Sequence, residues 1–322
     1  MNNPLVSVGI ITYNQEKYIE QCIDSILMQK VNFTYEIIIG EDCSPDNTRE
    51  ILLKYKEKYP DIIKLILHDK NIGPAQNGNG VKRVTTGKYY VGIEGDDFWI
   101  DENKLQKQFD FLESHPEYSA VGHNLYYAKP NGEVIYSAVE SKKDRVFTMN
   151  DYLKKGVFIH CNTIFRRNYF TNPDEKYKRL RSSYTTMGDI ATLALFFDKG
   201  DIYYMGEPML AHRLTDASDN ASFSQTEKKG LIKYTKMFFQ ITDALDEYFE
   251  GKYDFSYKAA NRLGHLYYCL LLKRKNYVIN EKEKKEFFDS LSFGFKLKGY
   301  YFMILKILRA VKRKARKLCS RT

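Results

Sequence analysis

The stretch Gly92-Ile93-Glu94-Gly95-Asp96-Asp97-Phe98-Trp99 places three carboxylates within four residues, directly after a hydrophobic run. The preceding Tyr89-Tyr90-Val91 is typical of a buried β-strand, so Glu94, Asp96 and Asp97 are expected just beyond its carboxyl end. In open α/β sheets, ligands bind at that edge. Neighbouring carboxylates repel one another, and a divalent cation with oxygen ligands commonly relieves the repulsion. The sequence therefore predicts a metal ion that holds a diphosphate at this edge.

Strands and helices alternate along the first part of the chain. Compact apolar runs predict strands, and apolar residues at helical spacing predict helices between them. The expected strands are residues 5–11, 35–40, 62–67 and 89–93, and the expected helices are residues 16–28, 50–59, 75–84 and 103–112. This alternation predicts an α/β fold whose mostly parallel sheet is covered by helices on both faces.

The pattern changes after residue 120. Short strand-like pieces at residues 120–127 and 134–136 predict a mixed sheet, and residues 202–204 and 208–212 are typical of edge strands. Residues 190–197 and nearly all of the chain after residue 225 have a helical pattern. We therefore expect one domain of residues 1–224 and a helical C-terminal region of residues 225–322.

The charge of the chain is concentrated at its C-terminal end. The formal net charge is +9, but residues 296–322 hold ten of the 50 Lys and Arg residues and no Asp or Glu, which leaves 40 basic and 41 acidic residues elsewhere. The body of the protein is therefore nearly neutral, and no nucleic-acid partner is expected. Five cysteines without CxxC spacing argue against a zinc site or a disulfide framework, and favour a reducing cytoplasmic compartment.

The basic C-terminal segment has the pattern of an amphipathic helix over residues 300–318. Its apolar residues recur at spacings of three and four, and they are Ile304, Leu308, Val311, Ala315 and Leu318. Such a helix is typical of one that lies in the interface of an anionic membrane. The alternative is a helix packed on the folded domain with a solvated basic face. Neither a secretory signal nor a spanning segment is expected, so we predict a cytoplasmic protein, peripheral on the inner face of the cell membrane.

Two further acidic residues, Glu41 and Asp42, end the second expected strand, next to Thr12-Tyr13-Asn14 at the end of the first. A carboxylate in this place can accept the N3 proton of a uracil ring. Alternatively, Asp42, Ser44 and Asp46 only cap the helix that follows. Capping explains Asp46, but a strand seldom ends in two acids, so we favour nucleotide contact for Asp42.

Trp99 is the only tryptophan and directly follows the three acids. The alternative to a metal site is an acidic turn that leads into the helix near Asn103. A bulky aromatic residue is unusual in such a turn, but it suits a wall for a sugar or a base. We therefore favour the metal site, with Asp96 as the foremost ligand of Mn²⁺ or Mg²⁺ and with water and phosphate oxygens completing the shell.

The chain resembles the inverting GT-A glycosyltransferases of family 2, which transfer sugars from nucleotide-diphosphate donors. The matching pieces are residues 6–14, 36–48, 71–73 and 87–99, in the order and spacing of the family. The resemblance implies a Rossmann-like GT-A fold and a hexosyl- or N-acetylhexosaminyltransferase of cell-surface polysaccharide synthesis. The expected partners are a nucleotide-sugar donor, with UDP as its nucleotide, and a glycan or lipid-linked acceptor.

The resemblance also assigns site residues. Those expected to line the nucleotide-sugar pocket are Thr12, Asn14, Glu41, Asp42, Gly73, Glu94, Gly95, Trp99 and Arg213. Glu94-Gly95-Asp96 stands where the family has its DxD motif, so Asp96, with Asp97, is expected to bind the metal. Glu94 and Glu41 each replace an Asp of the family. Both keep a carboxylate, but the longer side chain can shift donor preference.

Asp189 is the expected catalytic base, because inversion requires a group that deprotonates the acceptor hydroxyl. By resemblance, Gly188-Asp189 corresponds to an acidic pair ahead of an apolar helix, with Gly188 in place of its first acid. An N-cap role for Asp189 is the alternative, and the two roles can coexist. His212 replaces the usual Tyr beside Arg213. His160 and Asn162 are candidates for the acceptor pocket, with structural roles as the alternative.

Two other functions remain open at this point. A nucleotidyltransferase shares such a sheet and a metal, but it normally has a glycine-rich phosphate loop after the first strand. Thr12-Tyr13-Asn14-Gln15-Glu16 contains no glycine. The other alternative is a catalytically inactive, membrane-associated adaptor with the same fold.

Overall fold

The computed structural model describes residues 4–136, 143–155, 157, 159–168, 174–183, 188–214, 230–272 and 280–319. The chain divides into two compact units. The first comprises Met1–Met149, Val157–Asp174 and Gly188–Asp216, and the second comprises Asn150–Gly156, Glu175–Met187 and Ala217–Thr322. The boundary predicted between residues 224 and 225 lies outside the described residues and stays a prediction.

Within the described residues, the first unit is built on one sheet of ten strands. In chain order they are β1 (Val6–Thr12), β2 (Tyr35–Glu41), β3 (Ile63–Leu67), β4 (Tyr89–Glu94), β5 (Phe98–Trp99), β6 (Tyr118–Ala128), β7 (Val134–Ile135), β8 (Arg145–Phe147), β9 (Phe165–Arg167) and β10 (Asp201–Arg213). The spatial order is β3-β2-β1-β4-β9-β6-β10-β5, with β7 beside β6 and β8 beside β10. The first four strands in this order are parallel, as are β6 and β10, and β9 joins the two groups by antiparallel pairing. The predicted α/β fold is confirmed.

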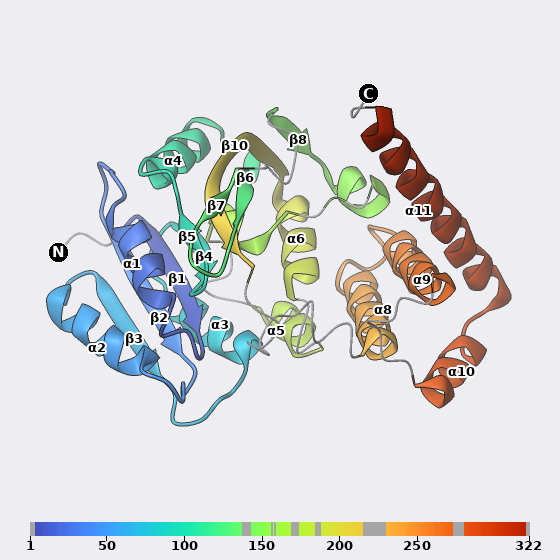
Figure 1. The fold of residues 1–322 in the computed structure, drawn as a ribbon, viewed down its shortest axis with the longest axis horizontal. Coiled ribbons are helices and arrows are strands. Elements are labelled where there is room, and N and C mark those ends of the chain that lie inside the picture. Colours follow the sequence, from blue (N-terminus) through green and yellow to red (C-terminus); the bar gives the residue numbers. More distant parts are fainter. Residues whose placement is uncertain are drawn as a thin grey trace. The chain divides into compact units, whose positions relative to one another are not determined.

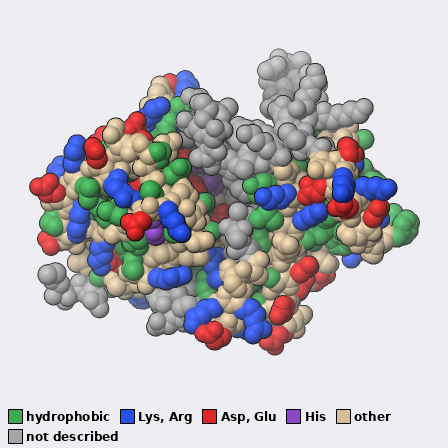
Figure 2. Space-filling model, turned by 90° about the horizontal axis from the view of Figure 1, so that it is seen from below, with side chains coloured by type: hydrophobic (Ala, Val, Ile, Leu, Met, Phe, Trp, Pro, Cys, Tyr) green, Lys and Arg blue, Asp and Glu red, His purple; other side chains and the backbone are tan. Residues whose placement is uncertain are grey.

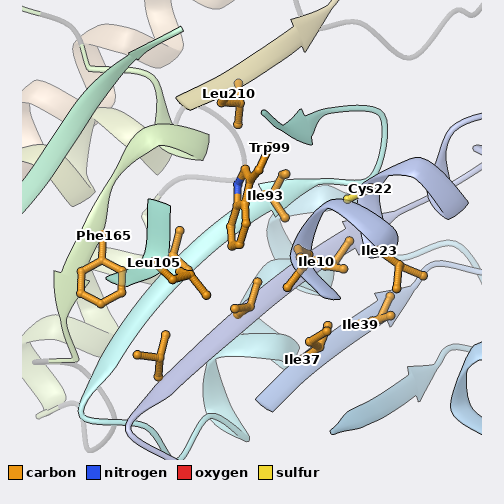
Figure 3. Close-up of a cluster of buried hydrophobic side chains, with 14 of the residues drawn as sticks. Ile10, Cys22, Ile23, Ile37, Ile39, Ile93, Trp99, Leu105, Phe165 and Leu210 are labelled. Carbon is orange, nitrogen blue, oxygen red and sulfur yellow. The ribbon is translucent and has the colours of Figure 1, made fainter. Parts of the chain in front are cut away.

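Helices cover both faces of the parallel strands (Figure 1). They are α1 (Ile19–Leu27), α2 (Thr48–Lys58), α3 (Pro74–Arg83), α4 (Lys104–Ser114) and α6 (Gly188–Lys199), with a 3-10 turn η2 (Cys161–Thr163). On one face Ile10 and Ile39 join α1 and α4 in a buried apolar cluster (Figure 3). On the other face α3 lies so close that a Cβ on Gly9 would meet Val81 Cγ1 at 2.8 Å. Apolar burial on both faces explains why these strands are continuous hydrophobic runs.

β10 differs from the expectation of two short edge strands. It is one strand that pairs with β6, β5 and β8, so it lies inside the sheet. Pro208 has no N–H to donate to a neighbouring strand, and the pairing of β10 with β6 shifts register between Met205 and Pro208 and again before Leu210. These irregularities let a proline occupy an interior strand, which the sequence pattern could not reveal.

The second unit is helical in its described residues. Its helices are η1 (Asp151–Lys155), α5 (Glu175–Ser182), α8 (Leu231–Tyr248), α9 (Ser256–Leu271), α10 (Glu281–Asp289) and α11 (Phe293–Cys319). Figure 1 shows α11 as a long helix beside α9, and Gly264 and Gly299 lie where the two helices meet. A Cβ on Gly299 would lie 2.7 Å from the Leu263 side chain. α11 begins seven residues before the predicted residue 300, so it is longer than expected.

The described surface mixes charges of both signs. On the face drawn in Figure 2, Lys and Arg side chains alternate with Asp and Glu side chains, as expected for a body with nearly balanced charge. Among the helices that the structure describes, none is long and apolar enough to span a membrane.

Candidate active site

The ends of three adjacent strands bring the predicted acidic residues to one edge of the sheet. In the parallel register, Thr12 at the end of β1 is the partner of Glu41 on β2, and Ile11 is the partner of Glu94 on β4. Asp42 follows directly after Glu41, and its backbone N–H donates to the Thr12 carbonyl oxygen over 3.1 Å. The expected gathering of Thr12, Glu41, Asp42 and Glu94 at the carboxyl ends is therefore present.

The two acids that end β2 are paired with protein groups. Glu41 is fully buried, accepts a hydrogen bond from the Ser44 backbone N–H, and forms an ion pair with Arg49 at 2.5 Å. Asp42 accepts from the backbone N–H groups of Ile72 and Gly73, each over 2.8 Å. These contacts fix the loop after β3, in which Gly73 has a φ of 85°, a value that glycine adopts readily.

Asn14 and Gly95 shape the backbone between these strand ends. Asn14 has a left-handed φ of 57°, which Asn tolerates better than most residues, and its backbone N–H donates to Ser44 Oγ. Gly95 leaves no room for a side chain, because a Cβ there would lie 2.4 Å from Gln15 Oε1 and 3.1 Å from Thr12 Cβ. Gly95 thus lets the loop after β4 pack against the end of β1.

Glu94 and Asp96 are buried carboxyl groups that repel each other and Asp97. Burial and repulsion by Asp96 and Asp97 raise the pKa of Glu94 to about 8, although the Asn162 side-chain amide donates to Glu94 Oε2 over 3.1 Å. Burial and repulsion by Asp97 raise the pKa of Asp96 to about 6. No described side chain forms an ion pair with either carboxylate. A cation between them would remove the repulsion that these shifts record.

Asp97 is placed differently from a metal ligand that faces solvent. It is fully buried, and its carboxylate accepts from the Asn162 side-chain amide at 2.5 Å and from the Arg213 backbone N–H at 2.9 Å. His212 Nδ1 lies 3.0 Å from both of its oxygens. Burial alone would lower the pKa of His212, but the bond and charge of Asp97 outweigh burial and raise it to about 9. Asp97 therefore acts as an internal anchor for His212, Arg213 and Asn162.

Trp99 lies in the core rather than at the wall of a pocket. Its side chain is 1% exposed and packs beside Ile93 in the buried cluster (Figure 3). The ammonium group of Lys104 lies 4.1 Å from the centre of a Trp99 ring, and it hydrogen-bonds to Gln108 Oε1. Burial lowers the pKa of Lys104 to about 7. The aromatic residue after the acids thus packs in the core between β5 and α4.

Arg213 is buried, and its guanidinium group donates hydrogen bonds to protein oxygens. Its Nε donates to the Asp96 carbonyl oxygen over 2.8 Å, and its two terminal nitrogens donate to the Pro130 carbonyl and to Gln21 Oε1. It is 3% exposed. These contacts hold the loop after β4, and the contact of Arg213 with a nucleotide sugar stays a prediction.

Asp189, at the start of α6, lies close enough to the acidic cluster for its charge to act on it. That charge raises the pKa of Glu94 and of the Cys161 thiol, in each case after larger effects of burial. Asn162, which bridges Glu94 and Asp97, comes from η2, 65 residues after Asp97 in the chain. The spacing of residues in the sequence does not predict the contacts of Asn162 with Glu94 and Asp97, nor the ion pair of Glu41 with Arg49.

The described residues fit a divalent ion that arrives with its diphosphate. They contain no group of three or more His, Cys, Asp or Glu side chains in an arrangement that would hold a metal by itself. Mg²⁺ in proteins is commonly bound by one or two carboxylates together with water and substrate phosphates. Glu94 and Asp96 can supply those carboxylate oxygens, whereas Asp97 is occupied by its protein donors.

A family model described as glycosyl transferase family 2 matches residues 7–172, which is just over half of the 322 residues. The chain belongs to this family. The match includes all the strand-end acids described above, from Glu41 to Asp97. The resemblance found in residues 6–14, 36–48, 71–73 and 87–99 is therefore confirmed at the level of the family.

Curated relatives of this family 2 protein include bacterial proteins. It is 32% identical over 174 residues to an uncharacterized protein of Mycobacterium tuberculosis, a match that covers 54% of this chain and 47% of that one. It is 29% identical over 236 residues to the putative teichuronic acid biosynthesis glycosyltransferase TuaG of Bacillus subtilis, covering 73% and 88%. The chain thus spans about half the length of the mycobacterial relative.

Among solved structures, the fold is similar to residues 1–349 of TarS from S. aureus, with a TM-score of 0.57 and 17% identity over 91% of this chain and 80% of that chain. The same TarS fragment in complex with UDP-GlcNAc gives a TM-score of 0.54 and 18% identity, over 81% and 70%. At this identity the similarity establishes the fold alone. It agrees with the GT-A arrangement expected from the sequence.

Proposed function

We propose that this family 2 protein is a metal-dependent, inverting glycosyltransferase that uses a nucleotide-diphosphate sugar. The observation that carries the proposal is the pair Glu94 and Asp96 at the end of β4, whose pKa values are raised by burial and by repulsion among the neighbouring carboxylates. Such a pair is suited to Mn²⁺ or Mg²⁺, which when bound would neutralise the diphosphate leaving group. The loop after β1, which contains Asn14, and the loop after β3, which contains Gly73, support a nucleotide site beside this pair.

Asp189 is the proposed catalytic base. It would accept the proton of the acceptor hydroxyl as that oxygen attacks the anomeric carbon on the face opposite the leaving diphosphate. Its electrostatic influence on Glu94 supports a position next to the reacting atoms. Asp97 would position the loop that carries Asp96. It holds His212 and the Arg213 backbone, and the Arg213 guanidinium group donates to the Asp96 carbonyl oxygen.

The donor nucleotide and the pathway are proposed from the relatives. TarS has been solved with UDP and with UDP-GlcNAc, and TuaG is named for teichuronic acid biosynthesis. We infer UDP as the nucleotide, a hexose or N-acetylhexosamine as the sugar, and a glycan or lipid-linked acceptor of cell-surface polysaccharide synthesis. The alternatives of a nucleotidyltransferase and an inactive adaptor predict no release of UDP from a UDP-sugar.

Donor hydrolysis tests this function without knowledge of the acceptor. Purified protein with Mn²⁺ and a panel of UDP-sugars should release UDP slowly, with water as the acceptor, and chelation of the metal should stop the release. Asp189→Asn should abolish release while the affinity for UDP stays unchanged. The matched control is Asp110→Asn, an exposed carboxylate on α4, which should behave as the wild type. Retained turnover in Asp189→Asn would remove Asp189 from the mechanism.

The membrane association expected from the sequence is proposed for α11. Its exposed apolar side chains form one stripe along the helix, in which Phe293, Leu297, Ile304, Leu308 and Val311 are each more than half exposed. Lys298, Arg309 and Lys312 are exposed on the adjoining side. An apolar stripe of this length costs free energy in water, and insertion among lipid tails beside anionic headgroups removes that cost. Ala315 and Leu318 were predicted to belong to the same apolar stripe, but their side chains lie outside the part of the chain whose side chains the structure describes.

Vesicle sedimentation tests the stripe. Wild-type protein should bind vesicles that contain phosphatidylglycerol better than vesicles of phosphatidylcholine, and Leu308→Glu should reduce binding to both. Leu53→Glu on α2 is the matched control, because Leu53 is 49% exposed and Leu308 is 59% exposed. Equal binding by both variants and the wild type would contradict membrane docking through α11.

A further inference from the structure

Three adjacent strands place a row of side chains on one face of the sheet, beyond the acidic cluster. Tyr127 on β6 is the register partner of Ile135 on β7 and of His212 on β10. Register partners on neighbouring strands have their side chains on the same face. The rings of Tyr127 and His212 are 6.0 Å apart, and the His160 ring lies 4.7 Å from that of His212. We call Ile135, Tyr127, His212 and His160 the aromatic row.

The aromatic row is accessible and continuous with the proposed catalytic site. Tyr127 and Ile135 are each 37% exposed, and the His212 side chain is 27% exposed. At the inner end of the row, His212 is hydrogen-bonded to Asp97. Burial and the charge of His212 lower the pKa of His160, and the charges of Asp97 and Asp189 partly offset this lowering. The row therefore leads from the surface to the carboxylates that surround the proposed reaction centre.

The place of the row in the sheet distinguishes it from the nucleotide side. The strand order is β2-β1-β4-β9-β6-β10, so the loops after β1 and β2 lie on one side of β4, and β6 and β10 lie on the other. A nucleotide held by the loops near Thr12 and Asp42 would direct its sugar toward Glu94 and Asp96. The acceptor must then approach from the remaining side, where the aromatic row lies.

We propose that the aromatic row is a binding subsite for a pyranose ring of the acceptor glycan. One face of a pyranose is lined by C–H groups and packs on aromatic and aliphatic side chains, while its hydroxyls hydrogen-bond to polar groups at the edge. Tyr127 and Ile135 supply the apolar surface. His212, whose Nδ1 is hydrogen-bonded to Asp97, would offer its Nε2 to a sugar hydroxyl at the edge of the row. This assignment rests on the proposed glycosyltransferase function.

The β6–β7 hairpin provides a matched control for this subsite. Tyr126 precedes Tyr127 on β6, so its side chain lies on the opposite face. Tyr136 follows β7, and its ring meets that of Tyr126 edge to face at 5.3 Å. Tyr136 is 80% exposed. Tyr136→Ala therefore removes an exposed aromatic ring from the same hairpin without touching the aromatic row, and Tyr127→Phe keeps the ring in the row.

Saturation-transfer difference NMR of the full chain with UDP and Mg²⁺ tests the subsite. The probes are the methyl β-glycosides of glucose, galactose and N-acetylglucosamine. We expect saturation of the ring C–H protons of at least one glycoside by wild type, by Tyr127→Phe and by Tyr136→Ala. Tyr127→Ala should weaken its binding about three- to tenfold. Equal saturation by Tyr127→Ala, or none from any probe with wild type, would overturn the subsite.

A parallel titration with UDP separates this proposal from the proposed function. Loss of glycoside saturation in Tyr127→Ala with unchanged UDP affinity supports an acceptor subsite. Weakened affinity for a UDP-sugar with unchanged affinity for UDP would instead place the row against the donor sugar and overturn the assignment to the acceptor. Failure of wild type to bind UDP would refute the proposed function. Saturation of the glycosides would in that case still show whether a sugar binds at the aromatic row.

Discussion

The acids that end β2 and the acids that follow β4 are of the same kind and lie at the same edge of the sheet, but their surroundings differ. Glu41 and Asp42 each have protein donors at hydrogen-bond distance, including the Arg49 guanidinium group. Glu94 and Asp96 are left with raised pKa values. Protein donors already compensate the charges at the end of β2, whereas the carboxyl groups after β4 need a bound ligand to compensate theirs.

Replacing Asp96 gives the largest expected effect on activity. Asp96→Asn should reduce sugar transfer by about a thousandfold or more, since one of two carboxylates for the cation is lost. It should not destabilise the fold, because it removes a charge that Asp97 repels. Thermal unfolding at pH 8 without metal should give a melting temperature equal to or above that of wild type. A lower value would show that Asp96 has a structural role like that of Glu41.

Replacing Glu41 tests the other half of the comparison. Glu41→Gln should lower the free energy of unfolding by about 2 to 3 kcal/mol, below the usual range for a broken buried ion pair because Arg49 is partly exposed. The measurement is urea unfolding at pH 7. Asp110→Asn is the exposed control, with an expected change within about 0.5 kcal/mol. Wild-type stability in Glu41→Gln would mean that the two acidic pairs do not differ as described.

The stability of the protein should depend on pH through Glu94. The folded-state pKa of about 8 lies above the ordinary glutamate value of 4.5, so the folded protein binds the proton more tightly and loses stability as pH rises between these values. Glu94→Gln should therefore be more stable than wild type by at least about 2 kcal/mol at pH 8.5 and nearly equal to it at pH 4.5. Unfolding without metal across this range is the measurement. A difference that does not change with pH would contradict it.

His212 gives the smallest expected effect, with the opposite sign. Asp97 raises its folded-state pKa to about 9 from 6.5, so the ion pair contributes fully below pH 6.5 and is lost as pH rises through 9. His212→Gln should lower the free energy of unfolding by about 1 kcal/mol at pH 6 and by much less at pH 10. The same loss at both pH values would show that packing, rather than charge, is responsible.

The parallel half of the fold was predictable from the sequence, because its elements are long and periodic. The strands near residues 6–12 and 89–94 and the helices between them follow from apolar runs and helical spacing. β9 has three residues and β5 has two, too few for a pattern to show. β10 appeared as two pieces because the sequence does not reveal the register shifts that accommodate Pro208.

The residue types of the candidate site were predictable, but their partners were not. The cluster after β4 is visible as Glu94, Asp96 and Asp97 in one short stretch. Which carboxylate is occupied depends on contacts far apart in the chain, such as Asp97 with Asn162 and His212. Trp99 follows the acids in sequence, yet its ring belongs to the core, since β5 turns it toward α4. Adjacency in sequence does not fix which way a side chain faces.

The most direct test of the account is a crystal structure of the protein with Mn²⁺ and UDP, with manganese located by its anomalous scattering. The account predicts one manganese peak at about 2.2 Å from an Asp96 carboxylate oxygen, bridged to the diphosphate, with the uracil ring beside the loop of Asp42 and Gly73. UDP bound elsewhere, or bound at this edge with no manganese next to Asp96, would contradict it.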